Sequence, residues 1–263
     1  MKNIAIIITS HNRLFKTRRC LLSILKLKNK FNIKINIYLT NDGCTDGTKE
    51  YIKKKFPKVK IFNGSGNLYW AGGMRFAWSK VRKKYDYYLW LNDDVYLYND
   101  FLKFFLKDIQ SINKNLDGNK FIISYPTFCN LTNRKSTGGL KITDNIFNYN
   151  FKLIKKKNKL IECDTFNGNC VLIPNKVFKI VGNIDQKFTH RFADHDYGLM
   201  SKKKGIKIYT SKNYCGICNL DKKKKYKIDD HKEWMYFLKK HSNFWPIHIA
   251  KFLLIRLLKK WIK

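Results

Sequence analysis

The sequence predicts an α/β protein with a mostly parallel central sheet and helices on both of its faces. Short apolar runs without polar alternation are typical of buried parallel strands, and turn residues separate them from segments with helical periodicity. In chain order, strands are expected at residues 4–8, 33–39, 60–62 and 87–91, with helices at 13–28, 49–56 and 74–84 between them. This alternation calls for a Rossmann-like sheet that is covered on both faces.

The second half of the chain has a weaker pattern. We expect helices at residues 100–113, 176–181, 190–204 and 234–263, and strands at 121–125, 171–174 and 206–209. Residues 130–159 are polar and contain Gly138-Gly139, which predicts a β-hairpin or a mobile loop. The predicted organisation is one domain over residues 1–215, with halves at about 1–95 and 96–215, followed by a basic helical extension over 216–263.

Length and charge limit the class of protein. With 263 residues, of which 44% are apolar, the chain can bury the core of one large domain. Its formal net charge of +35 implies an anionic partner, and nucleic acid, an acidic lipid surface and a phosphorylated small molecule are all open. The lysine runs at 53–55, 155–157, 202–204 and 222–225 lack interleaved aromatic residues and arginine, so solvated surfaces explain them better than nucleic-acid binding.

Seven cysteines are spread over the chain. An odd number, with no secretory signal before the first strand, indicates free thiols in a reducing compartment, so we expect a cytoplasmic protein. Cys215 and Cys218 have the spacing of a redox or zinc pair, but no second pair accompanies them and coincidence is favoured. No stretch reaches the roughly 20 apolar residues of a membrane-spanning helix.

An acidic motif follows the apolar run at residues 87–91. Asn92, Asp93 and Asp94 stand where open α/β sheets place their ligands, beyond the carboxyl end of a buried strand. Adjacent carboxylates repel each other unless a positive charge lies between them, and their oxygens suit Mg²⁺ or Mn²⁺ shared with a substrate phosphate. Taken alone, the motif is more often a solvated turn.

Four motifs together resemble the family 2 glycosyltransferases of the GT-A fold. They are Thr9-Ser10-His11-Asn12-Arg13, Asn41-Asp42-Gly43-Cys44-Thr45-Asp46-Gly47, Asn92-Asp93-Asp94 and Ala193-Asp194-His195-Asp196. The likeness covers about residues 4–209. Within the family, Gly66-Asn67-Leu68-Tyr69-Trp70-Ala71-Gly72-Gly73 and Leu91-Asn92-Asp93-Asp94-Val95 look like the bacterial rhamnosyltransferase-like branch, which builds surface polysaccharides.

The resemblance implies a nucleotide site at the ends of the first strands. Asp42 would accept the N3–H of a uracil or thymine ring, with Thr9 and Arg13 near the base and ribose. The glycines of residues 63–73 would let the backbone approach a sugar phosphate. The residues that the resemblance assigns to the nucleotide are Thr9, Asn12, Arg13, Asp42, Asn67 and Gly73.

The same resemblance implies a metal site at the Asp-x-Asp position, with Mg²⁺ or Mn²⁺ bridging the two phosphates of the donor. Asp94 would be the firmest ligand, with Asn92 and Asp93 beside it, although Asn92 replaces the first carboxylate of the family motif. Many relatives complete the metal shell with a late histidine. Residues 214–219 contain none, so the third protein ligand is open.

Asp194 matches the position of the family's general base, although Ala193 replaces the glutamate that often precedes it. It would take the proton of the acceptor hydroxyl as that oxygen attacks the anomeric carbon, and the product would be inverted. Asp196 would bind the acceptor or cap a helix. Trp70, Asp93 and His195 are further candidates for contacts with the donor sugar or the acceptor.

The implied function is therefore a metal-dependent, inverting transfer of a sugar from a UDP- or dTDP-linked donor. The acceptor would be a hydroxyl of a glycan or lipid-linked molecule in capsule, O-antigen or lipooligosaccharide synthesis. Two alternatives are a basic nucleic-acid-binding protein and a metal-dependent nucleotidyltransferase, but the latter does not explain a separate base at Asp194. A homodimer is also open.

The C-terminal extension has the pattern of an amphipathic basic helix. One side carries Ile247, Ala250, Leu253, Leu254, Leu257, Leu258 and Trp261. The other side carries His248, Arg256, Lys259 and Lys263, interrupted by Phe252 and Ile255. Two outcomes are open: the apolar side packs on the catalytic domain, or the helix holds the protein at the anionic inner face of the plasma membrane.

Overall fold

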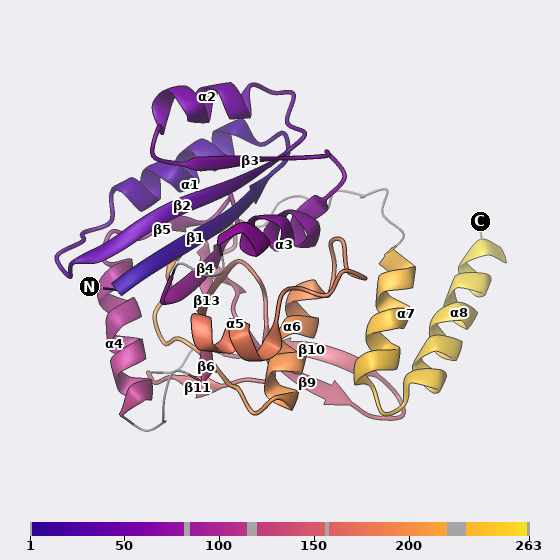
Figure 1. The fold of residues 1–263 in the computed structure, drawn as a ribbon. Helices are drawn as coiled ribbons and strands as arrows, with labels where there is room; N and C mark the ends of the chain where they lie inside the picture. The colour runs from indigo at the N-terminus through magenta and orange to yellow at the C-terminus, as the bar shows by residue number, and fades with distance from the viewer. Residues whose placement is uncertain (1, 82–84, 115–119, 156–157, 220–229, 262–263) are drawn as a thin grey trace.

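The computed structural model describes the chain except for residues 1, 82–84, 115–119, 156–157, 220–229 and 262–263. The end of the helix expected at 74–84, part of the lysine run at 155–157 and the whole run at 222–225 lie outside the described residues. Within these limits, one large central sheet, two small sheets and the helices around them make up the fold (Figure 1).

Eight strands form the central sheet. They are β1 (Lys2–Ser10), β2 (Ile33–Asp42), β3 (Lys60–Gly64), β4 (Tyr87–Leu91), β6 (Phe121–Ser124), β11 (Ile161–Glu162), β13 (Cys170–Pro174) and β14 (Lys207–Thr210), in the order β11-β14-β6-β13-β4-β1-β2-β3. β1 pairs in parallel with β2 and with β4, and β2 pairs in parallel with β3. β13 runs antiparallel to β4 and β6. The predicted, mostly parallel sheet is confirmed.

Helices cover both faces of this sheet. They are α1 (Leu14–Leu25), α2 (Thr48–Lys55), α3 (Tyr69–Val81), α4 (Phe101–Asn113), α5 (Asn175–Val181) and α6 (Ala193–Lys203). Two further helices, α7 (Asp230–His241) and α8 (Trp245–Trp261), follow at the C-terminal end of the chain, where α7 lies beside α6 (Figure 1). Successive side chains of a strand point to opposite faces, so Ile6 belongs to a core shared with α1, α2 and α4, and Ile7 belongs to a core shared with α3, α5 and α6. The helix expected from residue 13 begins one residue later, because Arg13 has no helical conformation.

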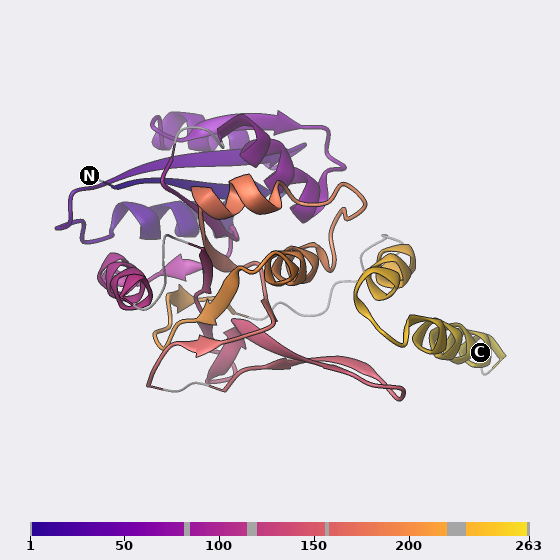
Figure 2. The same ribbon diagram turned by 60° about the horizontal axis from the view of Figure 1, so that its bottom comes forward.

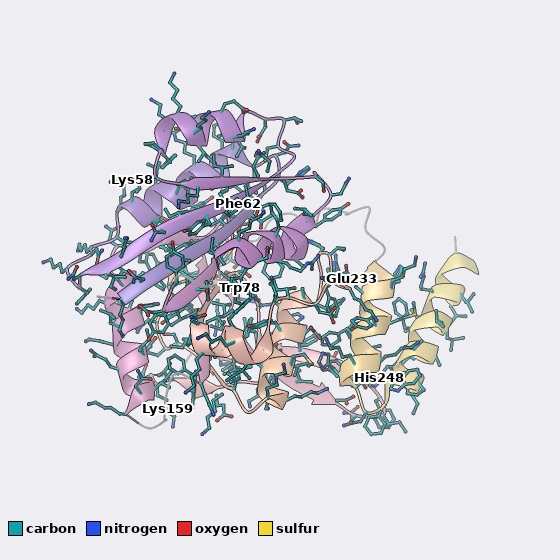
Figure 3. All side chains as sticks on the ribbon, viewed as in Figure 1. Lys58, Phe62, Trp78, Lys159, Glu233 and His248 are labelled. Carbon is teal, nitrogen blue, oxygen red and sulfur yellow. The ribbon has the colours of Figure 1, made fainter. Side chains whose placement is uncertain are left out.

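Aromatic side chains fill the core on the α3 side of the sheet. The ring of Trp78 packs edge-on against Trp90, with ring centroids 5.1 Å apart, and lies 4.6 Å from the ring of Phe178. Figure 3 shows Trp78 at the centre of the molecule, surrounded by side chains from the sheet and the helices. This cluster fixes α3 against β4, and therefore fixes the start of α3 relative to the acidic motif that follows β4.

Two small sheets are formed by strands between residues 96 and 217. One has the order β10-β9-β12 and consists of β9 (Gly139–Asp144), β10 (Tyr149–Leu153) and β12 (Thr165–Phe166). The other has the order β5-β15-β7-β8 and consists of β5 (Tyr96–Leu97), β7 (Thr127–Cys129), β8 (Arg134–Thr137) and β15 (Gly216–Ile217). β9 and β10 pair antiparallel, so the hairpin expected within residues 130–159 is present.

The extension forms two helices, α7 and α8, where the periodicity predicted one. Pro246 stands in the first turn of α8, where its missing N–H is tolerated. Phe237 and Leu238 of α7 are fully buried in the main core, so α7 is an integral part of the domain. None of the described helices is both long enough and apolar enough to span a membrane.

The expected division of the α8 surface is wrong at His248. The sequence placed this side chain on the solvated side, but it is buried and accepts or donates a 2.9 Å hydrogen bond with Ser242 Oγ. The apolar side, with Ile247, Leu253 and Leu254, is exposed instead. The side chains of Lys259, Trp261 and Lys263 lie outside the described part of the molecule.

Asp108 of α4 gives a prediction for the pH dependence of stability. Its carboxyl is buried and accepts a 2.6 Å hydrogen bond from Ser211 Oγ. Burial raises the pKa of Asp108 to about 6, although Ser211 and Lys212 oppose the rise. The folded chain therefore holds this proton more tightly than the unfolded chain, and the free energy of unfolding should fall as pH rises from about 4 to about 6.

Asp108→Asn should reduce this loss of stability by about 2 kcal/mol, measured by urea unfolding on either side of that window. Glu162→Gln, which alters an exposed carboxyl on β11, is the matched control. An equal pH dependence in wild type and Asp108→Asn would contradict the burial argument.

Candidate active site

The carboxyl ends of β1, β2 and β4 meet at one edge of the central sheet. They meet there because the three strands are parallel neighbours: Ser10 is paired with Asn41, and Ile7 is paired with Trp90. After β1 the chain first leads to β2 on one side and later to β4 on the other. Such a reversal of strand order leaves a crevice beyond the strand ends, where open α/β sheets bind ligands.

Arg13, just after β1, contacts both carboxylates of the acidic motif. Its Nη1 lies 3.1 Å from Asp93 Oδ1, and its Nη2 lies 2.5 Å from Asp94 Oδ2. Asp93 is almost fully buried, and its second oxygen accepts a 3.2 Å hydrogen bond from Thr17 Oγ1. Burial raises the pKa of Asp93 to about 7, Arg13 opposes this rise and Asp94 adds to it. Arg13 thus supplies the positive charge that two adjacent carboxylates need.

Asp94 is the member of the pair that is open to a ligand. Its side chain is 15% exposed, whereas that of Asp93 is 3% exposed. The thiol of Cys218 lies 3.7 Å from Asp94 Oδ1, in the segment that lacks the late histidine. Burial and the neighbouring Asp94 raise the pKa of the Cys218 thiol.

The donor groups at this place suit a metal ion that is shared with substrate. Within the described residues, no three histidine, cysteine, aspartate or glutamate side chains come together to hold an ion. A Mg²⁺ ion is commonly held by one or two carboxylates together with substrate phosphates and waters. Asp94 therefore suits a cation that is shared with a diphosphate. Asn92 and Asp93 contact Trp70 and Arg13 instead, and their part in metal binding stays a prediction.

Asp42, at the end of β2, orders the glycine-rich segment before α3. Its Oδ1 accepts a hydrogen bond from the N–H of Gly66 at 2.8 Å, and its Oδ2 accepts bonds from Leu68 and Tyr69, each at 3.0 Å. A Cβ on Gly64 would lie 2.7 Å from Asp42 Oδ1, so this close approach requires glycine. Both oxygens of Asp42 thus have a structural role, and the expected contact with a base stays a prediction.

Thr9 and Gly73 lie against each other. A Cβ on Gly73 would come within 2.4 Å of Thr9 Cγ2, and Thr40 Oγ1 donates a 2.8 Å hydrogen bond to the Gly73 carbonyl. Gly73 therefore lets α3 approach the sheet closely. The other two nucleotide candidates are exposed: Asn12 accepts a 2.7 Å hydrogen bond from the N–H of Thr45, and Asn67 lies on the glycine-rich segment.

Asp194, in the first turn of α6, connects to the acidic motif through a short chain of contacts. Its Oδ2 accepts a 2.7 Å hydrogen bond from the N–H of Gly168. A Cβ on Gly168 would lie 2.5 Å from the ring of Trp70, and Trp70 Nε1 donates a 2.8 Å bond to Asn92 Oδ1. Gly168 and Trp70 therefore link the candidate base to the candidate metal ligand. Sequence reasoning missed Gly168, whose only signal is its place between two buried strands.

His195 and Asp196 have different surroundings. The His195 ring stacks on Phe151, with centroids 4.3 Å apart, and neither ring nitrogen has a hydrogen-bond partner within the described part of the chain. Asp196 is buried and lies 2.7 Å from both Lys240 Nζ and His241 Nε2 of α7. These contacts with α7 favour a structural role for Asp196, and an acceptor contact remains a prediction.

Glu233 of α7 holds the segment that precedes Asp194, and sequence reasoning missed it as well. Its carboxylate accepts hydrogen bonds from the N–H groups of Thr189, His190 and Arg191, at 2.7, 3.3 and 2.8 Å, and from the Thr189 hydroxyl. The Thr189 carbonyl in turn accepts a 3.0 Å bond from the N–H of Ala71 in α3. Glu233 thus fixes one segment that touches both α3 and α6 (Figure 3).

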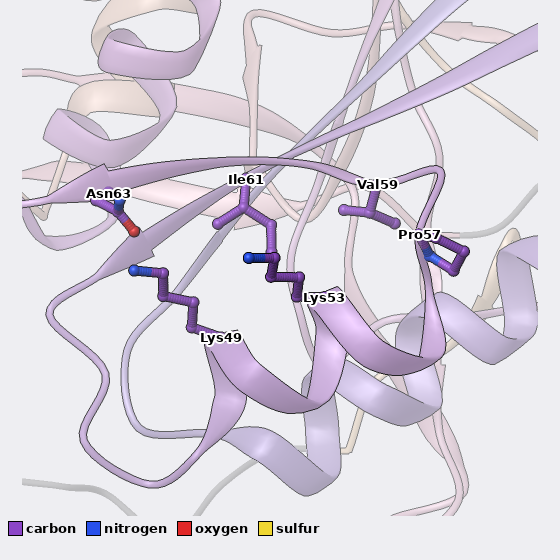
Figure 4. Close-up of a pocket in the computed structure, with 6 residues that line it drawn as sticks. All are labelled: Lys49, Lys53, Pro57, Val59, Ile61 and Asn63. Carbon is purple, nitrogen blue, oxygen red and sulfur yellow. The ribbon is translucent and has the colours of Figure 1, made fainter.

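A separate pocket lies between α2 and β3 at the edge of the sheet (Figure 4). Its lining consists of Lys49, Lys53, Pro57, Val59, Ile61 and Asn63. Only Asn63, the first residue of the glycine-rich segment 63–73, adjoins the predicted site, and we assign the pocket no function.

Comparison with known proteins agrees with this geometry. The model of the family described as glycosyl transferase family 2 matches residues 5–181, and the chain belongs to this family. The structures of S. aureus TarS 1–349, alone and in complex with UDP, have TM-scores of 0.56 and 0.57 at 13% and 12% identity. They cover 83% and 84% of this chain, which spans 60% and 61% of theirs. Among curated proteins, none matches the sequence.

These matches confirm the GT-A-like fold that the motifs implied. The family match ends before Asp194, so the likeness of residues 193–196 to the family motif rests on the sequence and on the geometry described above.

Glu233→Gln provides a test of the contact between α7 and the segment before α6. Glutamine keeps the size of the side chain but replaces one acceptor oxygen by a donor, which opposes the backbone N–H groups. We expect the free energy of unfolding to fall by about 2 kcal/mol or more. Amide hydrogen exchange at Thr189, His190 and Arg191 should accelerate.

Glu50→Gln on α2, an exposed position, is the control for loss of a glutamate charge. Unchanged exchange at the three amides in Glu233→Gln would show that Glu233 does not hold this segment.

Proposed function

We propose that the chain transfers a sugar from a UDP- or dTDP-linked donor to a hydroxyl of a glycan or lipid-linked acceptor, with inversion at the anomeric carbon. The transfer would belong to the synthesis of bacterial surface polysaccharide, as the rhamnosyltransferase-like motifs suggest. The proposal deepens the family assignment, which supports sugar transfer over a nucleic-acid-binding protein or a nucleotidyltransferase.

One observation carries this proposal: two separately held carboxylate groups are linked to each other through the contacts of Trp70. Asp93 and Asp94 are held by Arg13 at the ends of β1 and β4, whereas Asp194 is held by Gly168. Trp70 lies between them, because it contacts both Gly168 and Asn92. Sugar transfer needs such a division, with charge neutralisation at the diphosphate and a base at the attacking hydroxyl.

The donor diphosphate would lie beside Arg13 and Asp94. A bound Mg²⁺ or Mn²⁺ would neutralise the charge that builds on the leaving nucleoside diphosphate, with Asp94 as its protein ligand. Arg13 lies 31% exposed at the same place and presents a guanidinium, a group suited to phosphate oxygens. One of the two similar TarS structures is a complex with UDP, which is consistent with a uridine donor here.

Asp194 would act as the general base. Gly168 and the N–H of His195 each donate one hydrogen bond to it, so its two oxygens are oriented while the side chain keeps 19% exposure. A carboxylate that is fixed and still reachable can accept the proton of an acceptor hydroxyl. The ring of Trp70, which also lies against Gly168, is partly exposed and would contact the sugar.

Asp94→Asn should lower the rate of metal-dependent transfer by roughly 10²-fold or more. The substitution removes the negative charge of the metal-binding side chain without changing its size. Asp93→Asn should lose less, since Asp93 contacts Arg13 and Thr17. Transfer is measured at saturating Mn²⁺, with the exposed Asp100→Asn as control. Wild-type activity in Asp94→Asn would remove the metal assignment.

Asp194→Asn should keep donor binding and lose turnover by roughly 10²-fold or more, the scale of a general base. Its thermal stabilisation by donor should match that of wild type, where a ligand at about 100 times its dissociation constant adds about 2.7 kcal/mol. Unchanged turnover would place the base elsewhere, with Asp196 as the next candidate. Failure of every UDP- and dTDP-sugar to stabilise wild type with Mn²⁺ would overturn the donor class itself.

A further inference from the structure

The C-terminal helix α8 is attached to the body through one side only. His248 is buried, and its Nε2 lies 2.8 Å from the carbonyl oxygen of Asn145 at the tip of the β9–β10 hairpin. Phe252 packs on His231 of α7, with ring centroids 5.1 Å apart, and Lys251 Nζ donates a 2.9 Å bond to the Phe147 carbonyl. Figure 2 shows α8 as the outermost element, with α7 between it and the body. The position of α8 is therefore defined, and its other side faces outward.

The outward side of α8 is apolar. Leu254, Leu257 and Leu258 are each more than half exposed, and Ile247, Leu253 and Ile255 are each 43% exposed. The hairpin tip beside the helix adds Ile146 and Phe147, the latter 73% exposed. We call these eight residues, together with Trp245, the α8 patch. Of the 15 exposed large apolar side chains in the described part of the chain, nine belong to it. Such concentration marks a binding surface, because single exposed apolar residues are normally scattered.

The positive charge around the α8 patch indicates an anionic partner. The last 30 residues contain seven lysines and arginines and no aspartate or glutamate. Lys251 and Arg256 are exposed on α8 itself. A second copy of this chain would bring the same basic helix and a net charge of +35 against it, and like charges repel. An anionic lipid surface offers negative headgroups to the basic side chains and acyl chains to the apolar ones.

We propose that the α8 patch docks on an anionic lipid surface, with α8 lying in the plane of the interface. Apolar side chains of such helices enter the boundary between headgroups and acyl chains, while lysine and arginine remain at the headgroups. The exposed aromatic ring of Phe147 enters the same boundary from the hairpin tip. This inference rests on the C-terminal helix and the hairpin, and it holds whether or not the proposed sugar transfer is correct.

Three exposed leucines of the patch give a sharp test. Leu254, Leu257 and Leu258 are all replaced by serine in the full chain, which changes no charge and alters only side chains that are more than half exposed. The control replaces three exposed apolar residues elsewhere, Phe15, Leu25 and Leu131, by serine. Circular dichroism and thermal unfolding first establish that both variants fold like wild type. Each protein is then sedimented with vesicles of phosphatidylcholine, with and without phosphatidylglycerol.

Wild type and the control should pellet with phosphatidylglycerol vesicles in low salt, and high salt should weaken this binding. The α8 variant should bind at least about tenfold more weakly. Three results would overturn the proposal: no sedimentation of wild type with anionic vesicles, equal binding by the α8 variant, or equal binding to vesicles of phosphatidylcholine alone. A wild-type dimer in analytical ultracentrifugation that the α8 variant converts to a monomer would make the patch a contact between copies instead.

Discussion

The arrangement of the site depends on the compensation of one buried carboxylate. Asp93 lies at the end of a fully apolar strand, β4, and an ionised carboxyl there costs several kcal/mol unless it is paired. Arg13 supplies the pairing from the end of β1, and because its fork also contacts Asp94, it fixes the second carboxylate near the surface. One guanidinium therefore sets which carboxylate is buried and which is reachable. Arg13 also connects the ends of β1 and β4 at the crevice where the strand order reverses.

The rest of the site is assembled by glycines and backbone groups around this pair. Gly73 brings α3 against Thr9, Gly64 brings the following segment against Asp42, and Gly168 brings Asp194 against Trp70. In each case a Cβ would lie closer than 3 Å to the neighbouring side chain. These three glycines thus serve close packing between elements, and the reachable polar atoms of the site are placed by that packing. The approach of a sugar phosphate to the glycines of residues 63–73 stays a separate prediction.

The sequence could predict the strands and the sheet because the causes are local. Apolar runs and turn residues lie within a few positions of each other, and parallel pairing then forces residues 9–13, 42 and 92–94 to one edge. Glu233 could not be predicted in the same way, since its partners are more than 40 positions away and a single glutamate in a basic helix has no signature. His248 misled the periodicity argument because a buried histidine is stable once Ser242 and Asn145 satisfy its ring nitrogens.

The helix α7 joins the two parts of the molecule that periodicity treated as separate. Its Glu233 carboxylate binds the backbone before Asp194, and its Lys240 and His241 bind Asp196 of α6. Its Phe237 is buried in the main core, and its His231 packs on Phe252 of α8. All of these contacts come from one helix, so the outward side of α8 has a defined orientation relative to Asp194. A surface bound by the α8 patch would therefore also fix the direction in which the site opens.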